Sequence, residues 1–237
     1  MQHPVRRATT WTPVAVLIAV LAVSNVVSNR VLPESLYIPW NLLVAAAVLA
    51  IALRLDGREP DELGLSRATL ARGVRVGAIA VGLTTLTFLL AAALPATRDL
   101  FDDARAEGQS LPGILYNALV RVPLGTVVLE EVAFRGALPA VLLARVGLRP
   151  AVAVSAGLFG LWHVLPAANL REVNPAIEDV FGDASVVLVV VLAVLATAVA
   201  GFFLWWLRRW SGSLAAPALS HWSTNGLGYL LAYLVSD

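Results

Sequence analysis

Long apolar stretches constrain this chain more than any other feature, because they decide the solvent in which it folds. A helix that crosses a bilayer needs roughly 20 predominantly apolar residues, and none of the long stretches alternates with the period of two that a membrane barrel strand requires. We therefore predict an all-α fold, a polytopic transmembrane bundle of seven to eight helices forming one integral membrane domain over residues 1–237. The expected spans are about 11–29, 36–53, 74–95, 112–134, 150–168, 184–207 and 213–235.

One further apolar stretch, residues 137–146, is the reason for the range of seven to eight helices. It is too short to cross a bilayer alone. It could continue the fourth helix past Pro139, or it could form a re-entrant or interfacial turn. Both possibilities stay open at the level of the sequence.

Composition agrees with a membrane protein and excludes several partners. Hydrophobic residues make up 59% of the chain and charged residues only 14%, whereas about a quarter of a soluble domain is charged. The net charge is +1 and no basic stripe is visible, which argues against a nucleic-acid partner. Cysteine is absent, so disulfides, thiolate metal ligands and lipid-modified cysteines are excluded.

The distribution of arginine predicts the orientation in the membrane. With a cytoplasmic N-terminus and alternating spans, twelve of the 17 basic residues lie on the cytoplasmic side, four lie opposite, and Arg121 falls inside a span. Positive residues accumulate on the cytoplasmic side of membrane proteins. The first span is interpreted as a signal anchor, because no small-residue cleavage site follows it. The arginine-only, alanine- and valine-rich composition suggests a GC-rich bacterium, so we expect the bacterial inner (plasma) membrane.

Two segments are expected at the cytoplasmic edge. The longest connection on this side, residues 54–72, carries mixed charges and is interpreted as a solvated linker with a short surface helix. Trp205, Trp206 and Trp210 surround two arginines, the pattern of an aromatic belt at the membrane interface.

A small set of polar residues falls inside the expected spans. Such residues are rare, face the bundle interior and count as candidates for a functional site. A lone buried Glu–Arg pair would more simply join two helices, and a lone histidine would be a hydrogen-bonded core residue. The set comprises Arg121, Glu130, Glu131, Arg135, His163, His221 and Asn225.

Helical spacing divides this set into pairs. Residues four apart lie on one face of a helix, which applies to Glu131 and Arg135, and to His221 and Asn225. Phe159 and His163 share a face in the same way. Glu130 is rotated by roughly 100° from Glu131, so the two carboxylates have different tasks.

Two kinds of chemistry fit a carboxylate, two imidazoles and a carboxamide within reach of the cytoplasmic half of the membrane. A carboxylate in a low-dielectric setting can act as a general base for water, while an imidazole and a carboxamide can stabilise an oxyanion. Alternatively, Glu130, His163 and His221 match the ligand set of a catalytic zinc ion. Both point to hydrolysis of a carbonyl compound, most simply a peptide bond, with a divalent metal or with none.

The stretches "EEVAFRG", "FGLWH" and "HWSTN" resemble, in order, the EExxxR, FxxxH and HxxxN motifs of the CAAX-protease and bacteriocin-processing (CPBP) family of intramembrane proteases. The family includes the endopeptidases that trim prenylated CAAX proteins. The resemblance covers the catalytic half, about residues 112–235, and all key positions are present. The first 110 residues carry no motif.

The resemblance implies a role for each residue. Glu130, together with His163, would position and activate the attacking water, and His221 and Asn225 would stabilise the oxyanion. Glu131 and Arg135 would pair and fix the helix that presents Glu130. The family has been described both as metalloproteases and as metal-free glutamate proteases, and the oxyanion role suits asparagine better than a ligand role. Trp162 and Trp222 would either wall the site or simply pack in the bundle.

Other functions are weighed against this one. The HExxH motif of zinc proteases, a pair of membrane aspartates and a GxSG serine motif are all absent from the sequence. A small transporter usually carries internal repeats, and we find none. A bacteriocin-immunity factor or a non-catalytic scaffold stays open as an alternative. The expected partner is a peptide or membrane-protein substrate, whose identity no sequence feature reveals.

Overall fold

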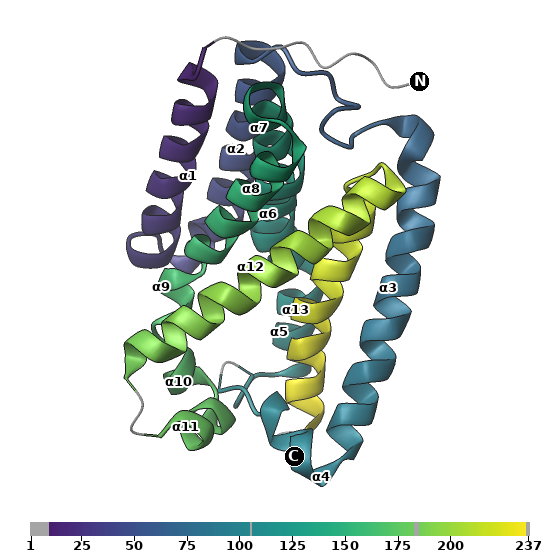
Figure 1. Cartoon of the computed structure of the whole chain (residues 1–237). Helices are drawn as coiled ribbons and strands as arrows, with labels where there is room; N and C mark the ends of the chain where they lie inside the picture. Colours follow the sequence, from purple (N-terminus) through teal and green to yellow (C-terminus); the bar gives the residue numbers. More distant parts are fainter. Residues whose placement is uncertain (1–9, 105, 183–184, 236–237) are drawn as a thin grey trace.

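The computed structural model describes residues 10–104, 106–182 and 185–235, and within them every regular element is a helix (Figure 1). The prediction of an all-α membrane bundle is confirmed. The elements are α1 (Thr12–Arg30), η1 (Glu34–Leu36), α2 (Tyr37–Ala50), η2 (Ile51–Leu55), α3 (Arg67–Ala93), α4 (Pro95–Arg98), η3 (Asp99–Phe101), α5 (Leu111–Tyr116), η4 (Asn117–Val127), α6 (Val128–Glu131), η5 (Val132–Ala137), α7 (Leu138–Val146), α8 (Leu148–Trp162), α9 (Val164–Ala167), α10 (Leu170–Val173), α11 (Pro175–Phe181), α12 (Val186–Ser211) and α13 (Ala215–Val235).

Five helices of the described chain are long and apolar enough to cross a membrane: Thr12–Arg30, Glu34–Leu55, Arg67–Ala93, Leu148–Ala167 and Val186–Ser211. The stretches expected at 112–134 and 213–235 are also helical. They are not among the five candidate spans. The count of seven to eight spans therefore stays a prediction for these two segments.

One helical rod, running without a break from α5 to α7, carries the first motif. Two of its segments, η4 and η5, are wound as π-helix, a form that is rare and concentrated at functional sites. Pro123 lies inside η4, where a proline removes an N–H donor and crowds the preceding turn. The segment 137–146 continues the rod past Pro139, which decides between the two alternatives that the sequence left open.

Long helices pack against the rod, while α3 lies on the far side of α13 (Figure 1). The rod packs against α2 on one side and α13 on another, while α12 crosses α8 and α13 packs along α3. Bare glycine backbone permits the closest approaches. A Cβ added to Gly77 of α3 would lie 2.7 Å from Leu219 of α13, and one added to Gly160 of α8 would lie 2.5 Å from the carbonyl oxygen of Val194 in α12.

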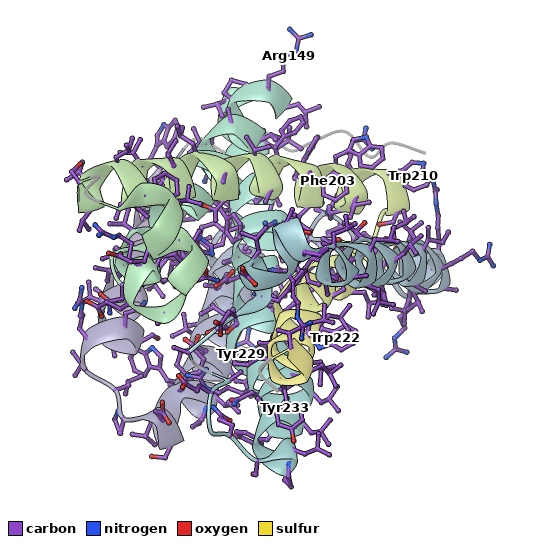
Figure 2. The ribbon with its side chains drawn as sticks, turned by 90° about the horizontal axis from the view of Figure 1, so that it is seen from below. Arg149, Phe203, Trp210, Trp222, Tyr229 and Tyr233 are labelled. Carbon is purple, nitrogen blue, oxygen red and sulfur yellow. The ribbon has the colours of Figure 1, made fainter. Side chains whose placement is uncertain are left out.

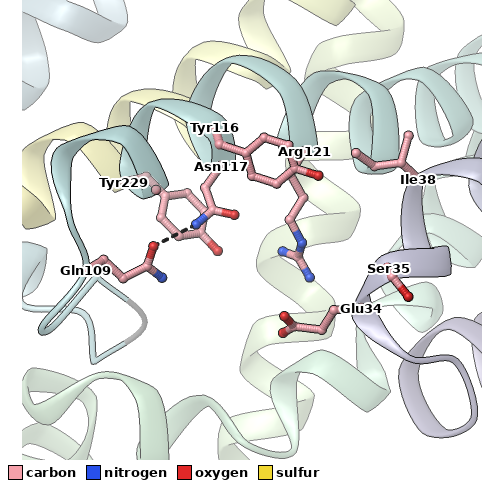
Figure 3. A pocket seen from close by; sticks show the side chains of 9 residues that line it. Glu34, Ser35, Ile38, Gln109, Tyr116, Asn117, Arg121 and Tyr229 are labelled. Carbon is pink, nitrogen blue, oxygen red and sulfur yellow. Dashed lines mark hydrogen bonds between the residues drawn. The ribbon is translucent and has the colours of Figure 1, made fainter.

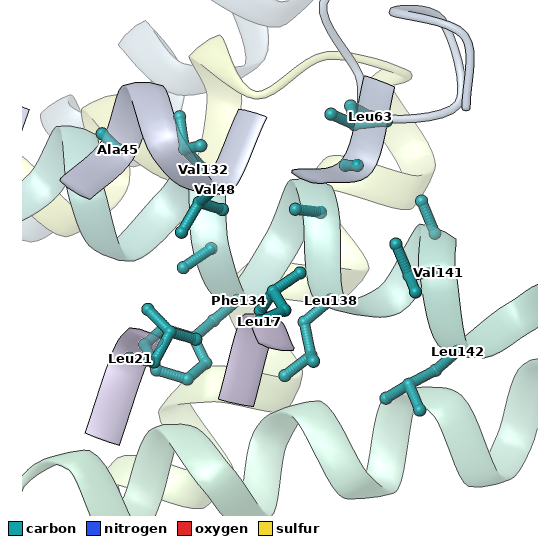
Figure 4. Packing of buried hydrophobic residues seen from close by; sticks show 14 of the residues in the cluster. Leu17, Leu21, Ala45, Val48, Leu63, Val132, Phe134, Leu138, Val141 and Leu142 are labelled. Carbon is teal, nitrogen blue, oxygen red and sulfur yellow. The ribbon is translucent and has the colours of Figure 1, made fainter. Parts of the chain in front are cut away.

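The largest apolar cluster joins α1 and α2 to the rod at the level of the first motif (Figure 4). Leu17 and Val48 are fully buried there and Phe134 is 3% exposed. Phe134 lies between Glu131 and Arg135 in sequence but faces apolar side chains. This packing holds the motif against the N-terminal helices.

The connection 54–72 is in part the solvated linker that its charges predicted, because most of its residues are exposed, whereas Arg58 is 6% exposed and Leu63 is fully buried. Its last residues form the exposed first turns of α3, which starts at Arg67, and not a separate surface helix. Asp56 pairs with Arg58 at 2.8 Å and also with Arg145 at the end of α7. Charges at this end of the bundle are therefore satisfied by one another, which allows the loop to fold inward.

The end of α12 carries an exposed aromatic row. Trp206 stacks on Trp210 with ring centroids 5.6 Å apart, and Phe203 stacks on Trp206. Phe203 and Trp210 lie on the outer side of the helix (Figure 2), and all three are about half exposed. The row fits the aromatic belt expected from the sequence, whereas Trp205 is only partly exposed.

Candidate active site

The first motif folds into a buried ion pair on the central rod. Arg135 Nη1 lies 3.1 Å from Glu131 Oε1, four residues earlier, and the two side chains are 1% and 2% exposed as residues. The predicted pairing is confirmed. The Arg135 guanidinium also lies 3.8 Å from the centroid of the Phe159 ring. A buried charge needs such partners, so this pair and the ring fix the motif against α8.

His221 of α13 joins both glutamates. Its Nδ1 lies 2.7 Å from Glu131 Oε1, and its Nε2 lies 3.6 Å from Glu130 Oε2. Asn225 Nδ2 lies 3.2 Å from the same Nε2, one turn further along α13. The expected shared face of His221 and Asn225 is thus confirmed, and the structure brings four predicted residues into contact.

Glu130 is 5% exposed and uses its two oxygens differently. Oε1 accepts a hydrogen bond of 2.9 Å from Trp162 Nε1. Oε2 makes no hydrogen bond to any group in the described part of the chain. Buried polar atoms without a partner are rare and often belong to functional sites. Glu131 Oε2 also makes no hydrogen bond within the described residues. The two carboxylates differ in the partners of Oε1, which are Trp162 for Glu130, and His221 and Arg135 for Glu131.

His163 belongs to the same cluster but does not contact Glu130 within hydrogen-bond distance. It is the residue at which α8 ends, and its Nδ1 lies 2.8 Å from the Phe159 carbonyl oxygen. Its ring is edge-on to Phe159 at 4.7 Å between centroids, and His221 approaches Phe159 at 6.0 Å. Phe159 thus contacts both imidazoles and the Arg135 guanidinium.

The donor set does not form a metal cage. Among the described residues, no group of three or more His, Cys, Asp or Glu side chains could hold a metal ion. The Nε2 atom of His221, the nitrogen that could face a metal, lies 3.2 Å from the Asn225 amide nitrogen. Glu130, His163 and His221, the ligands suggested by the sequence, therefore do not fit a metal in this conformation, and we derive no step through one.

Trp222 has a specific contact with the rod, beyond ordinary packing. Its Nε1 donates to the Ala118 carbonyl oxygen at 2.8 Å. In a π-turn the carbonyl of residue 118 would accept from the N–H of residue 123, and residue 123 is proline, which has none. The indole supplies the missing donor and ties α13 to η4 one residue after His221.

The N-terminal helices, which carry no motif, also reach the site. Asn25 Nδ2 donates to the Trp162 carbonyl oxygen at 2.9 Å, and the Tyr37 hydroxyl lies 3.1 Å from Thr126 Oγ1. Neither residue was predicted from the sequence. Asn25 could have been found as a polar residue within the first apolar span. Tyr37 could not, because tyrosine is common at the membrane ends of helices and its presence there does not indicate a site.

An apolar cleft of about 230 Å³ adjoins the site between α1 and α8. Phe134, Trp162, Leu21 and Leu158 are among the residues that line it. Trp162 therefore separates Glu130 from this cleft with one aromatic ring. Its predicted role as a wall of the site agrees with these contacts.

The comparison with known proteins matched the half of the chain that carries the motifs. Residues 111–227 match a family model described as Type II CAAX prenyl endopeptidase Rce1-like. No curated protein and no solved structure matched the chain. The matched segment begins at α5 and includes every residue of the three motifs. This match supports the assignment of the chain to the CPBP family of CAAX-type proteases.

Proposed function

We propose that the protein is an intramembrane endopeptidase that hydrolyses peptide bonds with a water activated by Glu130. The observation that carries this proposal is the convergence of Glu130, His221 and Asn225 in a buried setting. Glu130 Oε2 and His221 Nε2 lie 3.6 Å apart, and Asn225 Nδ2 is 3.2 Å from Nε2. A base, an imidazole and an amide donor are thus within reach of one reacting carbonyl.

Hydrogen bonding indicates where the water binds. If the neutral imidazole of His221 donates from Nδ1 to Glu131, its Nε2 is an acceptor. Glu130 Oε2 is also an acceptor and has no other partner in the described chain. The single lone pair of Nε2 already accepts from Asn225 Nδ2, so Glu130 Oε2 is the acceptor left to hold a water. A water that donates a hydrogen to Oε2 satisfies this carboxylate and lies beside His221, where it can attack a carbonyl.

The reaction then proceeds with each group in a defined role. The water oxygen bonds to the peptide carbonyl carbon while Glu130 accepts its proton. Asn225 has a second N–H that can donate to the developing oxyanion. When the C–N bond breaks, Glu130 returns the proton to the leaving nitrogen. Glu131, paired with Arg135, holds the imidazole of His221 in place.

His163 takes part in this proposal through the family resemblance. Its Nδ1 faces the Phe159 carbonyl, so the ring donates there and Nε2 is left as an acceptor. We assign it to the water or the substrate, as the resemblance implies. This role requires His163 to approach Glu130 on substrate binding, since catalytic hydrogen bonds often tighten only in the complex.

A metal-free, glutamate-type mechanism is the version that the contacts support. Glu131 occupies His221 Nδ1, and the amide of Asn225 occupies Nε2. Neither imidazole nitrogen of His221 thus faces an open coordination position. The expected substrate is a peptide or a membrane-protein segment.

Cleavage by purified protein in liposomes tests the proposal. An unbiased peptide library would be incubated with wild type and with Glu130→Gln, with and without a chelator, and read by mass spectrometry. We expect Glu130→Gln to lower cleavage by about 10²- to 10⁴-fold, the usual contribution of a general base, while Glu107→Gln on an exposed loop leaves it unchanged. Equal activity of wild type and Glu130→Gln would refute the assignment. Loss of wild-type activity on chelation would refute the metal-free version alone.

A further inference from the structure

A second, polar cavity of about 580 Å³ opens between η1, α5, η4 and α13 (Figure 3). Its size is within the range of small-ligand sites. Polar side chains converge on it from four segments, among them Glu34, Gln109, Asn117, Arg121 and Tyr229. None of these residues belongs to the three motifs, so the proposed chemistry does not account for them.

Arg121 is the residue of this cavity that most needs an explanation. It lies within the rod, in a segment that the sequence predicts to cross the membrane, where an arginine is costly and marks a functional position by default. Its guanidinium lies 4.7 Å from the centroid of the Tyr37 ring. No carboxylate lies within 4.0 Å of it in the described chain. The cation is therefore oriented by an aromatic ring while its N–H donors face the cavity (Figure 3).

The cavity is linked to the catalytic residues along the rod. The Tyr37 hydroxyl contacts Thr126, and a Cβ on Gly125 would lie 2.8 Å from the Tyr37 ring, so this ring packs directly on the rod. Thr126 precedes Glu130 by four residues and follows Arg121 by five. Arg121 and Glu130 are nine residues apart, which corresponds to at most about 13 Å along a helix.

We propose that this cavity binds a carboxylate of the peptide substrate, held by Arg121. The inference rests on the proposed function. A guanidinium recognises a carboxylate through two parallel hydrogen bonds, and the Tyr37 ring fixes its plane. The carboxylate can come from an acidic side chain or from a free C-terminus. An extended chain advances about 3.3 Å per residue, so the carboxylate lies about four residues from the bond that Glu130 attacks.

Glu34 opposes this binding. Its exposed side chain reaches from η1 toward Arg121 across the cavity (Figure 3). A like charge near the bound carboxylate weakens the complex. Glu34→Gln should therefore lower the KM for carboxylate-bearing peptides, in the direction opposite to the effect of Arg121→Gln.

Matched peptides test the inference. One series moves a single Asp from two to six residues away from the cleaved bond, with Asn analogues, and a second series compares free with amidated C-termini. We expect kcat/KM to favour one carboxylate position, about four residues away, by about 10- to 100-fold. Arg121→Gln should remove this preference in kcat/KM, and Arg121→Lys should keep part of it. Arg30→Gln, on an exposed arginine at the end of α1, should leave it unchanged.

A binding measurement separates the two proposals. Fluorescent peptides that carry the carboxylate would be titrated onto Glu130→Gln protein and onto Glu130→Gln combined with Arg121→Gln. Weaker binding by the second variant, about 10-fold or more, supports the inference even if wild type cleaves nothing. Cleavage or binding that is equal for acidic and neutral peptides, or unaffected by Arg121→Gln, overturns the inference and leaves the proposed function standing. A preference in the Asp series would identify an acidic side chain as the source of the carboxylate, and a preference for free over amidated ends would identify the C-terminus.

Discussion

The hydrogen bond from Trp222 to the Ala118 carbonyl gives a prediction whose magnitude can be worked out. Ala118 is fully buried in η4. In a π-turn its carbonyl would accept from the N–H of residue 123, but Pro123 has no N–H. Trp222→Phe keeps an aromatic ring and removes the donor. An unsatisfied buried acceptor costs about 1–3 kcal/mol, and interhelical hydrogen bonds measured in membranes contribute about 0.6 and at most about 1.7 kcal/mol. We therefore expect a loss of about 1–1.7 kcal/mol in unfolding free energy.

A double-mutant cycle isolates this hydrogen bond from lost packing. Pro123→Ala restores an N–H that can serve the Ala118 carbonyl, so Trp222→Phe should cost about 1 kcal/mol less in that background. Stability would be followed by reversible unfolding in detergent micelles. Trp206→Phe is the matched control, because that indole is about half exposed and should change stability by less than about 0.5 kcal/mol.

Additivity would refute the reasoning. If the cost of Trp222→Phe is the same within about 0.5 kcal/mol with proline or alanine at position 123, then the indole is not replacing the missing N–H. A second readout concerns catalysis. Since Trp222 follows His221 on α13, loss of the contact should lower kcat more than it raises KM, and Pro123→Ala should restore part of kcat.

Two further predictions concern the buried ion pair and the orientation. Glu131→Gln or Arg135→Leu breaks a pair that is almost fully buried, so each should cost about 3–5 kcal/mol of stability; a thermal scan in detergent that finds no loss for either variant would contradict the supporting role. For the orientation, the absence of cysteine allows single introduced thiols to report the sides of the membrane. Arg149→Cys should react with a membrane-impermeant reagent only from the cytoplasmic side and Gly108→Cys only from the opposite side, and the reverse pattern would invert the proposed topology and the expected cytoplasmic location of the site.

The sequence by itself determined that the chain folds in a membrane, and which polar residues pair within a single helix. Uninterrupted apolar stretches decide for a membrane bundle, because charged or irregular segments cannot be satisfied in hydrocarbon. Spacing of four residues placed Glu131 with Arg135, and His221 with Asn225, because both pairs depend only on the turn of one helix. The motifs also indicated the family, since three of them occur in order on separate helices.

Only the tertiary structure decided which helices meet and which atoms are left without partners. That His221 touches both glutamates depends on how α13 packs against the rod, and no local pattern encodes this. The role of the motif-free half, through Asn25 and Tyr37, and the inward fold of the loop around Asp56 have the same origin. Each arises because a buried polar group must find its partner in space, and that partner is often distant in sequence.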